Sequence, residues 1–115
     1  FPKLRWGFFE SGCTWVFAAV QTALHVRLKP ADLMSLVQEK LDEHNFFITC
    51  ELHEDLGLII KYTGDSRLMM GSDYGHPGDI GETFLFRQEL AKRTDLSDDV
   101  KRRLVSDNCA RLFTL

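Results

Sequence analysis

The stretch NFFITCEL, residues 45–52, combines aromatic and β-branched residues with almost no polar interruption. A strand with one solvent-exposed face alternates apolar and polar residues, and this stretch does not. Continuously apolar strands are typical of parallel sheets, because helices cover both faces of such a sheet. Residues 45–52 therefore predict a buried strand in a protein of the α/β class.

Two other segments have the same character. Residues 4–9 are bulky and aromatic, and residues 67–73 (RLMMGSD) place three apolar residues before a glycine. Apolar residues that recur at three- and four-residue spacing predict helices between and after these strands. The predicted helices span residues 14–28, 30–45, 54–62 and 82–93, and a last helix begins at Ser97. The chain is therefore expected to form a parallel βαβαβα segment.

Length and composition indicate one soluble globular domain over residues 1–115. The 44% of hydrophobic and 27% of charged residues are ordinary for such a domain. The net charge is -3 and the 14 basic residues are spread along the chain, so no nucleic-acid partner is expected. The apolar runs are shorter than the roughly 20 residues of a membrane-spanning helix, and no basic-then-apolar leader opens the chain. We expect a cytoplasmic protein without a membrane partner.

The three cysteines are Cys13, Cys50 and Cys109. They are widely separated and odd in number, which fits neither a disulfide framework nor the spacing of a zinc ribbon. Free cysteine is among the most frequently buried residue types. We expect reduced thiols that lie mostly in the core.

Candidate chemistry lies at the carboxyl ends of the strands, where parallel α/β proteins place their functional groups. Glu10 leaves the first predicted strand, Glu51 and His53 leave the second, and Asp73 and His76 leave the third. A carboxylate at a strand end can bind a metal or act as a general base. Asp73 and Glu10 are the catalytic candidates, and the other three residues are candidates for binding substrate.

The carboxylates have structural alternatives. An acidic residue directly after a strand often caps the following helix, and this interpretation applies to Glu10 and Glu51. Asp73 differs, because the preceding Gly71 is expected to allow close approach of neighbouring backbone. The glycines after Asp73 also make a helix cap less natural there.

The histidines form no motif of their own. His53 and His76 also fit ordinary hydrogen-bonded loop positions, and His25 and His44 lie on predicted helices, where we expect structural or solvent-facing roles. The chain has no HxH pair, no HExxH and no GxGxxG. A lone aspartate does not hold a catalytic zinc, which commonly takes three protein ligands and a water. The chemistry is therefore incomplete on this chain.

Three segments carry a family resemblance. They are FPKLRWGFFESGCTWV at 1–16, NFFITCELHEDLGLIIKYTGDSRLMMGSDYGH at 45–76 and DNCARLFTL at 107–115. The most specific element is the strand end GSDYGH, followed about thirty residues later by a helix of the form Asp-Asn-x-Ala-Arg-x-Phe/Tyr. Together these segments resemble the C-terminal part of the amidohydrolase-related family, metal-dependent hydrolases and non-oxidative decarboxylases built on a (β/α)8 TIM barrel.

The resemblance implies that the chain is a single partial domain, the last three units of such a barrel. Asp73 then corresponds to the family's metal-binding aspartate at the end of the eighth strand, which ligates the metal or takes a proton from its bound water. Glu10 stands at the end of the sixth strand, where many members carry a histidine. The resemblance also implies a divalent metal, first of all zinc, whose remaining ligands fall upstream of Phe1.

The expected function is therefore the C-terminal part of a metal-dependent hydrolase or decarboxylase that acts on a small carboxylated or amide-like substrate and is inactive alone. Because the chain opens at Phe1 with an apolar strand and no initiator Met, we expect the sequence to begin inside a longer protein. A third of a barrel leaves strand edges unpaired, so association with the missing N-terminal part or with a second copy is expected. One alternative is a stand-alone α/β binding or scaffold module without chemistry. A phosphate-binding flavodoxin-like domain is weaker, because no turn carries a glycine-rich phosphate loop.

Overall fold

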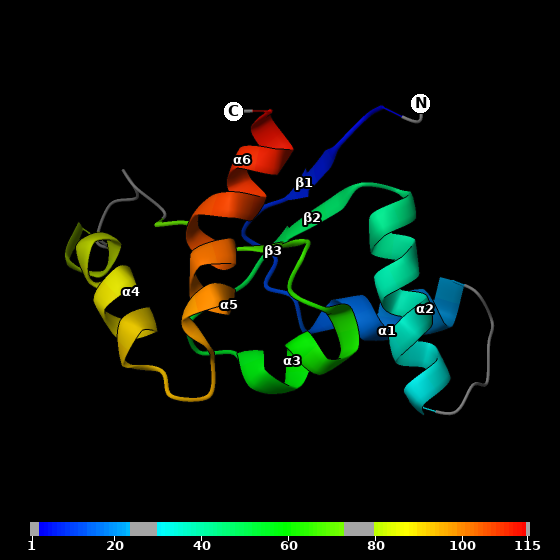
Figure 1. Ribbon diagram of the computed structural model, residues 1–115, viewed down its shortest axis with the longest axis horizontal. Helices are drawn as coiled ribbons and strands as arrows, with labels where there is room; N and C mark the ends of the chain where they lie inside the picture. Colours follow the sequence, from blue (N-terminus) through cyan, green and yellow to red (C-terminus); the bar gives the residue numbers. More distant parts are fainter. Residues whose placement is uncertain (1–2, 24–29, 73–79, 115) are drawn as a thin grey trace.

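The computed structural model describes residues 3–23, 30–72 and 80–114, and it is a mixed α/β structure built on a small parallel sheet (Figure 1). The strands are β1 (Trp6–Phe8), β2 (Phe46–Thr49) and β3 (Leu68–Met69), paired in the order β1-β2-β3. Both pairs are parallel, and Ile48 lies opposite Phe8 on one side and Leu68 on the other. The predicted α/β class and the parallel arrangement are confirmed. The strands are shorter than predicted, and β1 is largely exposed where a buried strand was expected.

Helices follow the strands as the periodicity predicts. They are α1 (Trp15–Ala23), α2 (Pro30–Glu43), α3 (Leu56–Thr63), α4 (Ile80–Lys92), α5 (Asp98–Arg102), the π-helical turn η1 (Arg103–Asp107) and α6 (Asn108–Phe113). The predicted end of the first helix falls at 24–29, outside the described residues. The single helix predicted after Ser97 is wrong in one respect, because a π-helical turn divides it. None of the helices that the structure describes is long and apolar enough to cross a membrane.

The main core lies between one face of the sheet and helices α1, α2 and α3. The apolar stripe of α2 supplies Leu33, Val37 and Leu41, each no more than 2% exposed. These side chains join Ile48 of β2 and Leu68 of β3 in one cluster of buried residues. On the opposite face of the sheet a smaller cluster consists of Phe47, Met69 and Leu112 of α6. The two faces of β2 are thus covered by different helices, as its continuous apolar sequence predicts.

Local signals set both ends of α3. The Asp55 carboxylate accepts a hydrogen bond of 3.0 Å from the Leu58 N–H and so caps the first turn. Gly64 ends the helix at φ 66°, and its N–H donates to the Ile60 carbonyl at 2.9 Å. The predicted C-terminal cap at Gly64 is confirmed.

The outer edge of β3 is closed by the C-terminal helices. The Met70 N–H donates to the carbonyl of Leu104 in η1 at 2.8 Å. The Asn108 side chain, fully buried, donates through Nδ2 to the carbonyls of Asp65 at 2.6 Å and Leu68 at 2.7 Å. The π-helical turn thus places a helix carbonyl and a side-chain amide against the strand, which explains why a uniform helix does not form here.

The edge of β1 is exposed. Leu4, Trp6 and Phe9 are 43%, 51% and 55% exposed. A short strand with exposed aromatic residues at a sheet edge is a ready template for further pairing. The sheet is therefore closed at β3 and open at β1 (Figure 1).

Replacing Asn108 with alanine should lower the free energy of unfolding by about 2–4 kcal/mol, because two carbonyls lose their buried donor. The matched control is Ser106→Ala, two residues earlier and exposed, which should change stability by less than about 0.5 kcal/mol. Urea denaturation followed by circular dichroism measures both. Equal midpoints for the two variants would show that Asn108 does not anchor β3.

Candidate functional site

The carboxyl ends of the three strands meet at one edge of the sheet, and a cavity of about 190 Å³ lies there. Its walls include Glu10 after β1, Glu51 after β2 and Gly71 after β3. Phe9, Thr49 and Cys50 complete the lining. The structure therefore brings together Glu10 and Glu51, from two of the predicted strand exits, with Gly71 of the third predicted strand.

A larger cavity of about 660 Å³ adjoins the first and shares its Glu51 and Gly71 walls. His53 and Ser72 line it from the strand side, and the α4 residues Leu85, Phe86 and Glu89 line it from the other side. The predicted substrate-binding residues Glu51 and His53 thus share one cavity. Asp73 and His76 lie outside the described residues, and Ser72 is the last described residue before them.

The predicted close approach of backbone to Gly71 is not seen among the described residues. Within residues 3–23, 30–72 and 80–114, a Cβ atom added at this glycine would meet no atom within 4 Å. The glycine lies on the wall of both cavities, and its missing side chain contributes to their volume.

The helix-capping interpretation of Glu10 and Glu51 is also wrong. The N-terminal cap of α3 is Asp55, and the first N–H groups before α1 bond to Glu54. Glu10 has a φ of 55°, a left-handed conformation that costs a non-glycine residue about 1–2 kcal/mol. Its side chain is exposed at the cavity rather than engaged in a helix cap.

Glu54 is the residue at this edge that sequence reasoning missed. Its side chain lies in a buried position, 8% exposed, and accepts hydrogen bonds from two separate loops. From the loop before α1 the donors are the Cys13 N–H at 2.9 Å, the Thr14 N–H at 3.0 Å and the Thr14 hydroxyl. From its own loop the donor is the Glu51 N–H at 2.8 Å. We call these four contacts, together with a fifth from the Cys13 thiol at 3.1 Å, the Glu54 clamp.

The clamp sets the ionisation of its members. Burial alone raises the pKa of Glu54, but hydrogen bonds from the Thr14 hydroxyl, the Glu51 N–H and the Cys13 N–H outweigh burial and lower the pKa to about 2. The hydrogen bond to Cys50, burial and the Glu54 carboxylate raise the pKa of the Cys13 thiol. Cys13 therefore stays protonated at neutral pH, which argues against a nucleophilic role, because the thiolate is the reactive form.

Gly12 is required by the clamp. Its φ is 58°, and a Cβ added there would lie 2.9 Å from Glu54 Oε1. The sequence predicts a helix that begins at Glu54, where the helix dipole would stabilise an acidic side chain. The carboxylate instead serves the start of α1, 40 residues earlier in the chain. No residue near Glu54 in the sequence indicates such a contact. The glycine in the SGCT turn, residues 11–14, is the sequence feature that marks the turn whose N–H groups bind Glu54.

The cysteine prediction is confirmed in its main part. All three cysteines are free, and Cys13 and Cys50 are buried at 1% and 3% exposure. Cys109 is half-buried, and burial raises the pKa of its thiol. His44 packs against Phe46 with the ring centroids 5.4 Å apart, consistent with its predicted structural role.

Within residues 3–23, 30–72 and 80–114, no group of three or more His, Cys, Asp and Glu side chains is placed to hold a metal ion. Glu10, Glu51 and His53 supply oxygen and imidazole donors of the types that zinc takes, but at this edge they line cavities rather than converge on a point. No family model, no curated protein and no solved structure matches the chain.

Replacing Glu54 with glutamine should lower the free energy of unfolding at pH 7 by about 3 kcal/mol, since a pKa reduced from near 4.5 to about 2 favours the ionised folded state by that amount. The folded pKa lies below the unfolded value, so this contribution is complete above about pH 5 and is lost as the pH falls toward 2. Urea denaturation at a series of pH values between 7 and 2.5 measures both effects.

The control is Glu51→Gln, which removes a carboxylate from the same loop but leaves the donated N–H in place. It should change stability at pH 7 by less than about 1 kcal/mol. A Glu54→Gln variant with the wild-type urea midpoint at pH 7 would rule out the Glu54 clamp as a stabilising interaction.

Proposed function

We propose that the chain is the C-terminal part of a metal-dependent amidohydrolase-like hydrolase or decarboxylase that acts on a small carboxylated or amide-like substrate. The observation that carries the proposal is the gathering of Glu10, Glu51 and His53 around adjoining cavities at the carboxyl ends of parallel strands. Functional groups of barrel enzymes lie at this end of the strands. The larger cavity, of about 660 Å³, has a size that suits a small molecule.

Each predicted residue has a role in this proposal. Asp73, the residue after Ser72 in the sequence, is the ligand that the chain would contribute to a metal. Glu10, exposed at the smaller cavity, would exchange protons with substrate. Glu51, His53 and His76 would bind the polar groups of the substrate.

The described residues do not themselves form a metal site. The proposal therefore assigns the remaining ligands to sequence upstream of Phe1. A divalent metal bound there would polarise the substrate or its attacking water. Free cysteines fit a reducing compartment, which supports a cytoplasmic location for the complete enzyme.

One observation favours the alternative of a stand-alone binding or scaffold module. Closure of a barrel requires its last strand to pair along its outer edge, but here Leu104 and Asn108 occupy that edge of β3. A chain that closes its own sheet edge has less need of a neighbouring strand. The open edge of β1, in contrast, is what a missing preceding strand would leave.

The 115-residue chain should self-associate, because the exposed β1 edge carries Trp6 and its apolar neighbours Leu4 and Phe9. Sedimentation over a range of concentrations should detect dimers or larger species. Trp6→Lys should shift the distribution toward monomer, because a lysine on an edge strand opposes pairing. The control Leu58→Lys replaces an exposed apolar residue of α3, 46% exposed, and should leave association unchanged. A wild-type chain that is monomeric at every concentration would contradict the fragment interpretation.

In the complete protein, Asp73→Asn should remove bound divalent metal and lower turnover by at least about 100-fold, because the metal loses an anionic ligand. Metal content per chain is measured first, since it requires no knowledge of the substrate. Asp98→Asn, at the exposed start of α5, is the matched control and should retain metal and activity. Unchanged metal content in Asp73→Asn would remove the site assignment. An intact mass equal to 115 residues, with no metal, would favour the binding module instead.

A further inference from the structure

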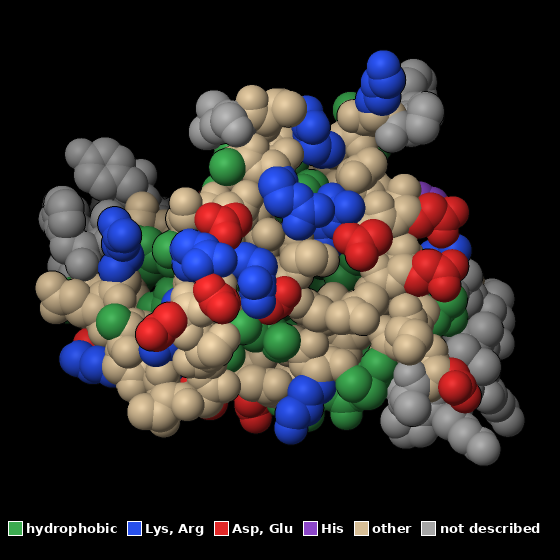
Figure 2. Space-filling view, viewed as in Figure 1, with side chains coloured by type: hydrophobic (Ala, Val, Ile, Leu, Met, Phe, Trp, Pro, Cys, Tyr) green, Lys and Arg blue, Asp and Glu red, His purple; other side chains and the backbone are tan. Residues whose placement is uncertain are grey.

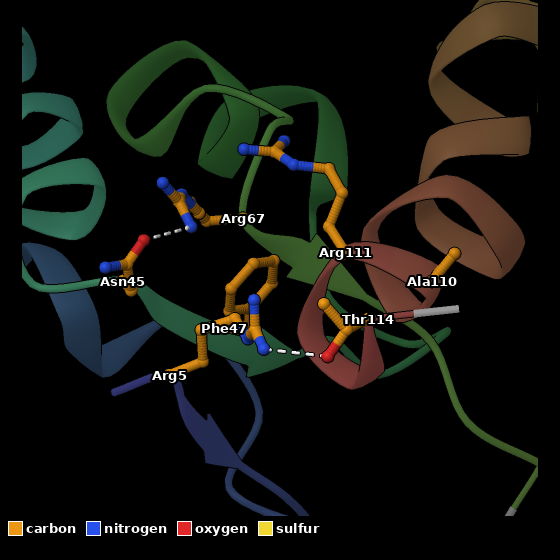
Figure 3. Close-up of a pocket in the computed structure, with 7 residues that line it drawn as sticks. All are labelled: Arg5, Asn45, Phe47, Arg67, Ala110, Arg111 and Thr114. Carbon is orange, nitrogen blue, oxygen red and sulfur yellow. Dashed lines mark hydrogen bonds between the residues drawn. The ribbon is translucent and has the colours of Figure 1, made fainter. Parts of the chain in front are cut away.

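The opposite edge of the sheet carries another cavity, of about 410 Å³, at the amino ends of the strands (Figure 3). It is lined by Arg5, Asn45, Phe47, Arg67, Ala110, Arg111 and Thr114. These residues precede or begin each of the three strands or belong to the end of the chain at α6. The cavity is thus built from four separate parts of the sequence, and three of its side chains are arginines. Figure 2 shows Lys and Arg side chains gathered over the same region, between α6 and the start of β2.

Arg67 is the fixed element of this cavity. It is 7% exposed, and its Nε donates to Asp42 Oδ1 at 2.6 Å. Its Nη1 donates to Asn45 Oδ1 at 3.2 Å, and its guanidinium lies over the Phe47 ring with 4.7 Å from Cζ to the ring centroid. Contacts on its edge and its face hold the guanidinium in one orientation, which reduces the entropy lost when a ligand binds.

The other two arginines line the same cavity from different sides (Figure 3). Arg5 donates to the Thr114 hydroxyl at 2.7 Å, and Arg111 donates to the Ser66 carbonyl at 2.9 Å with its guanidinium 5.9 Å from the centroid of the Phe47 ring. Among the residues that the structure describes, neither Arg5 nor Arg111 has a carboxylate within salt-bridge distance. Within that part of the chain, their remaining N–H groups face no carboxylate and can donate to an anion.

The charge of the cavity and the hydrogen-bond donors of its arginines indicate which kind of ligand it binds. Within the described residues, the three guanidinium groups and the Asp42 carboxylate paired with Arg67 sum to a local charge of +2, close to the charge of about -1.5 to -2 that a phosphate monoester carries at pH 7. The arginine side chains offer only donors, and phosphate oxygens offer only acceptors. Phe47 is 1% exposed beneath the arginines, so its ring face is not open for stacking on a base.

From these observations we infer that the cavity formed by Arg5, Arg67 and Arg111 is a binding site for the phosphate group of a small phosphomonoester. Arg67 forms the preoriented floor of the site. Arg5, just before β1, and Arg111, in α6, donate hydrogen bonds to the anion from two sides. The site lies at the opposite edge of the sheet from the proposed catalytic residues and shares no lining residue with their cavities. It therefore does not depend on the proposed function.

Calorimetric titration of the 115-residue chain with inorganic phosphate at low ionic strength and pH 7.5 tests the inference. We expect saturable binding with a dissociation constant of about 1 mM or tighter. Arg5→Gln and Arg111→Gln should each weaken binding at least about 10-fold, because each removes a charge-assisted hydrogen bond. Arg102→Gln is the matched control, since Arg102 lies on the same C-terminal helical stretch but is paired with Asp99 and Asp107, and it should bind as wild type.

Two comparisons separate a phosphomonoester site from a general anion-binding surface. Dimethyl phosphate, a diester with one negative charge, should bind at least about 10-fold more weakly than the dianion. Binding of inorganic phosphate should also weaken at pH 5.5, where phosphate carries one charge. The inference is overturned by an absence of saturable binding, by equal binding of the diester, or by wild-type affinity in both Arg5→Gln and Arg111→Gln.

Circular dichroism of each variant accompanies the titration. Arg5 and Arg111 are exposed and contribute little to the core, so their variants should keep the wild-type spectrum and urea midpoint. Arg67 is excluded from the test because its loss would leave the neighbouring Asp42 and Asn45 groups without their donor.

Discussion

The arrangement of this chain depends on one buried carboxylate. Glu54 accepts hydrogen bonds from the backbone of the loop before α1 and from the backbone of its own loop before α3. These loops leave β1 and β2 at the same edge, so the clamp fixes the separation of the two strand exits. A carboxylate that takes this many donors remains ionised when buried, because the hydrogen bonds replace the water it has lost. The positions of Glu10 and Glu51 at the cavity follow from that fixed separation.

Features that depend on local sequence could be predicted. The stripe of α2 is set by its spacing, and the cap at Gly64 is set by a conformation that glycine adopts without strain. The parallel order of the strands follows from helices that separate continuously apolar segments. The position of Glu10, Glu51 and His53 around two adjoining cavities follows in turn, since carboxyl ends of parallel strands share an edge.

Features that depend on distant contacts could not be predicted. Glu54 binds the N–H groups of the turn before α1 rather than capping its own helix, and no residue close to it in the sequence indicates that partner. The same holds for Asn108, whose amide bonds to carbonyls about 40 residues earlier, and for the π-helical turn that brings Leu104 to β3. The motif DNCARLF carries part of the family resemblance. In this chain its Asn108 binds carbonyls at the outer edge of β3 and so closes that edge of the sheet. Arg67 and Arg111, spread among other basic residues, gave no sign of a shared cavity in the sequence.

The two edges of the sheet have opposite chemical character. At the carboxyl ends Glu10 and Glu51 border the cavities, and at the amino ends arginines border theirs. Successive residues of a strand point to opposite faces, so Phe47 under the basic cavity and Thr49 in the wall of the acidic one lie on the same face of β2. That face is the one opposite α1, α2 and α3, and Leu112 of α6 packs on it. The arginine cavity is the better formed of the two, since its groups are fixed by contacts within this chain.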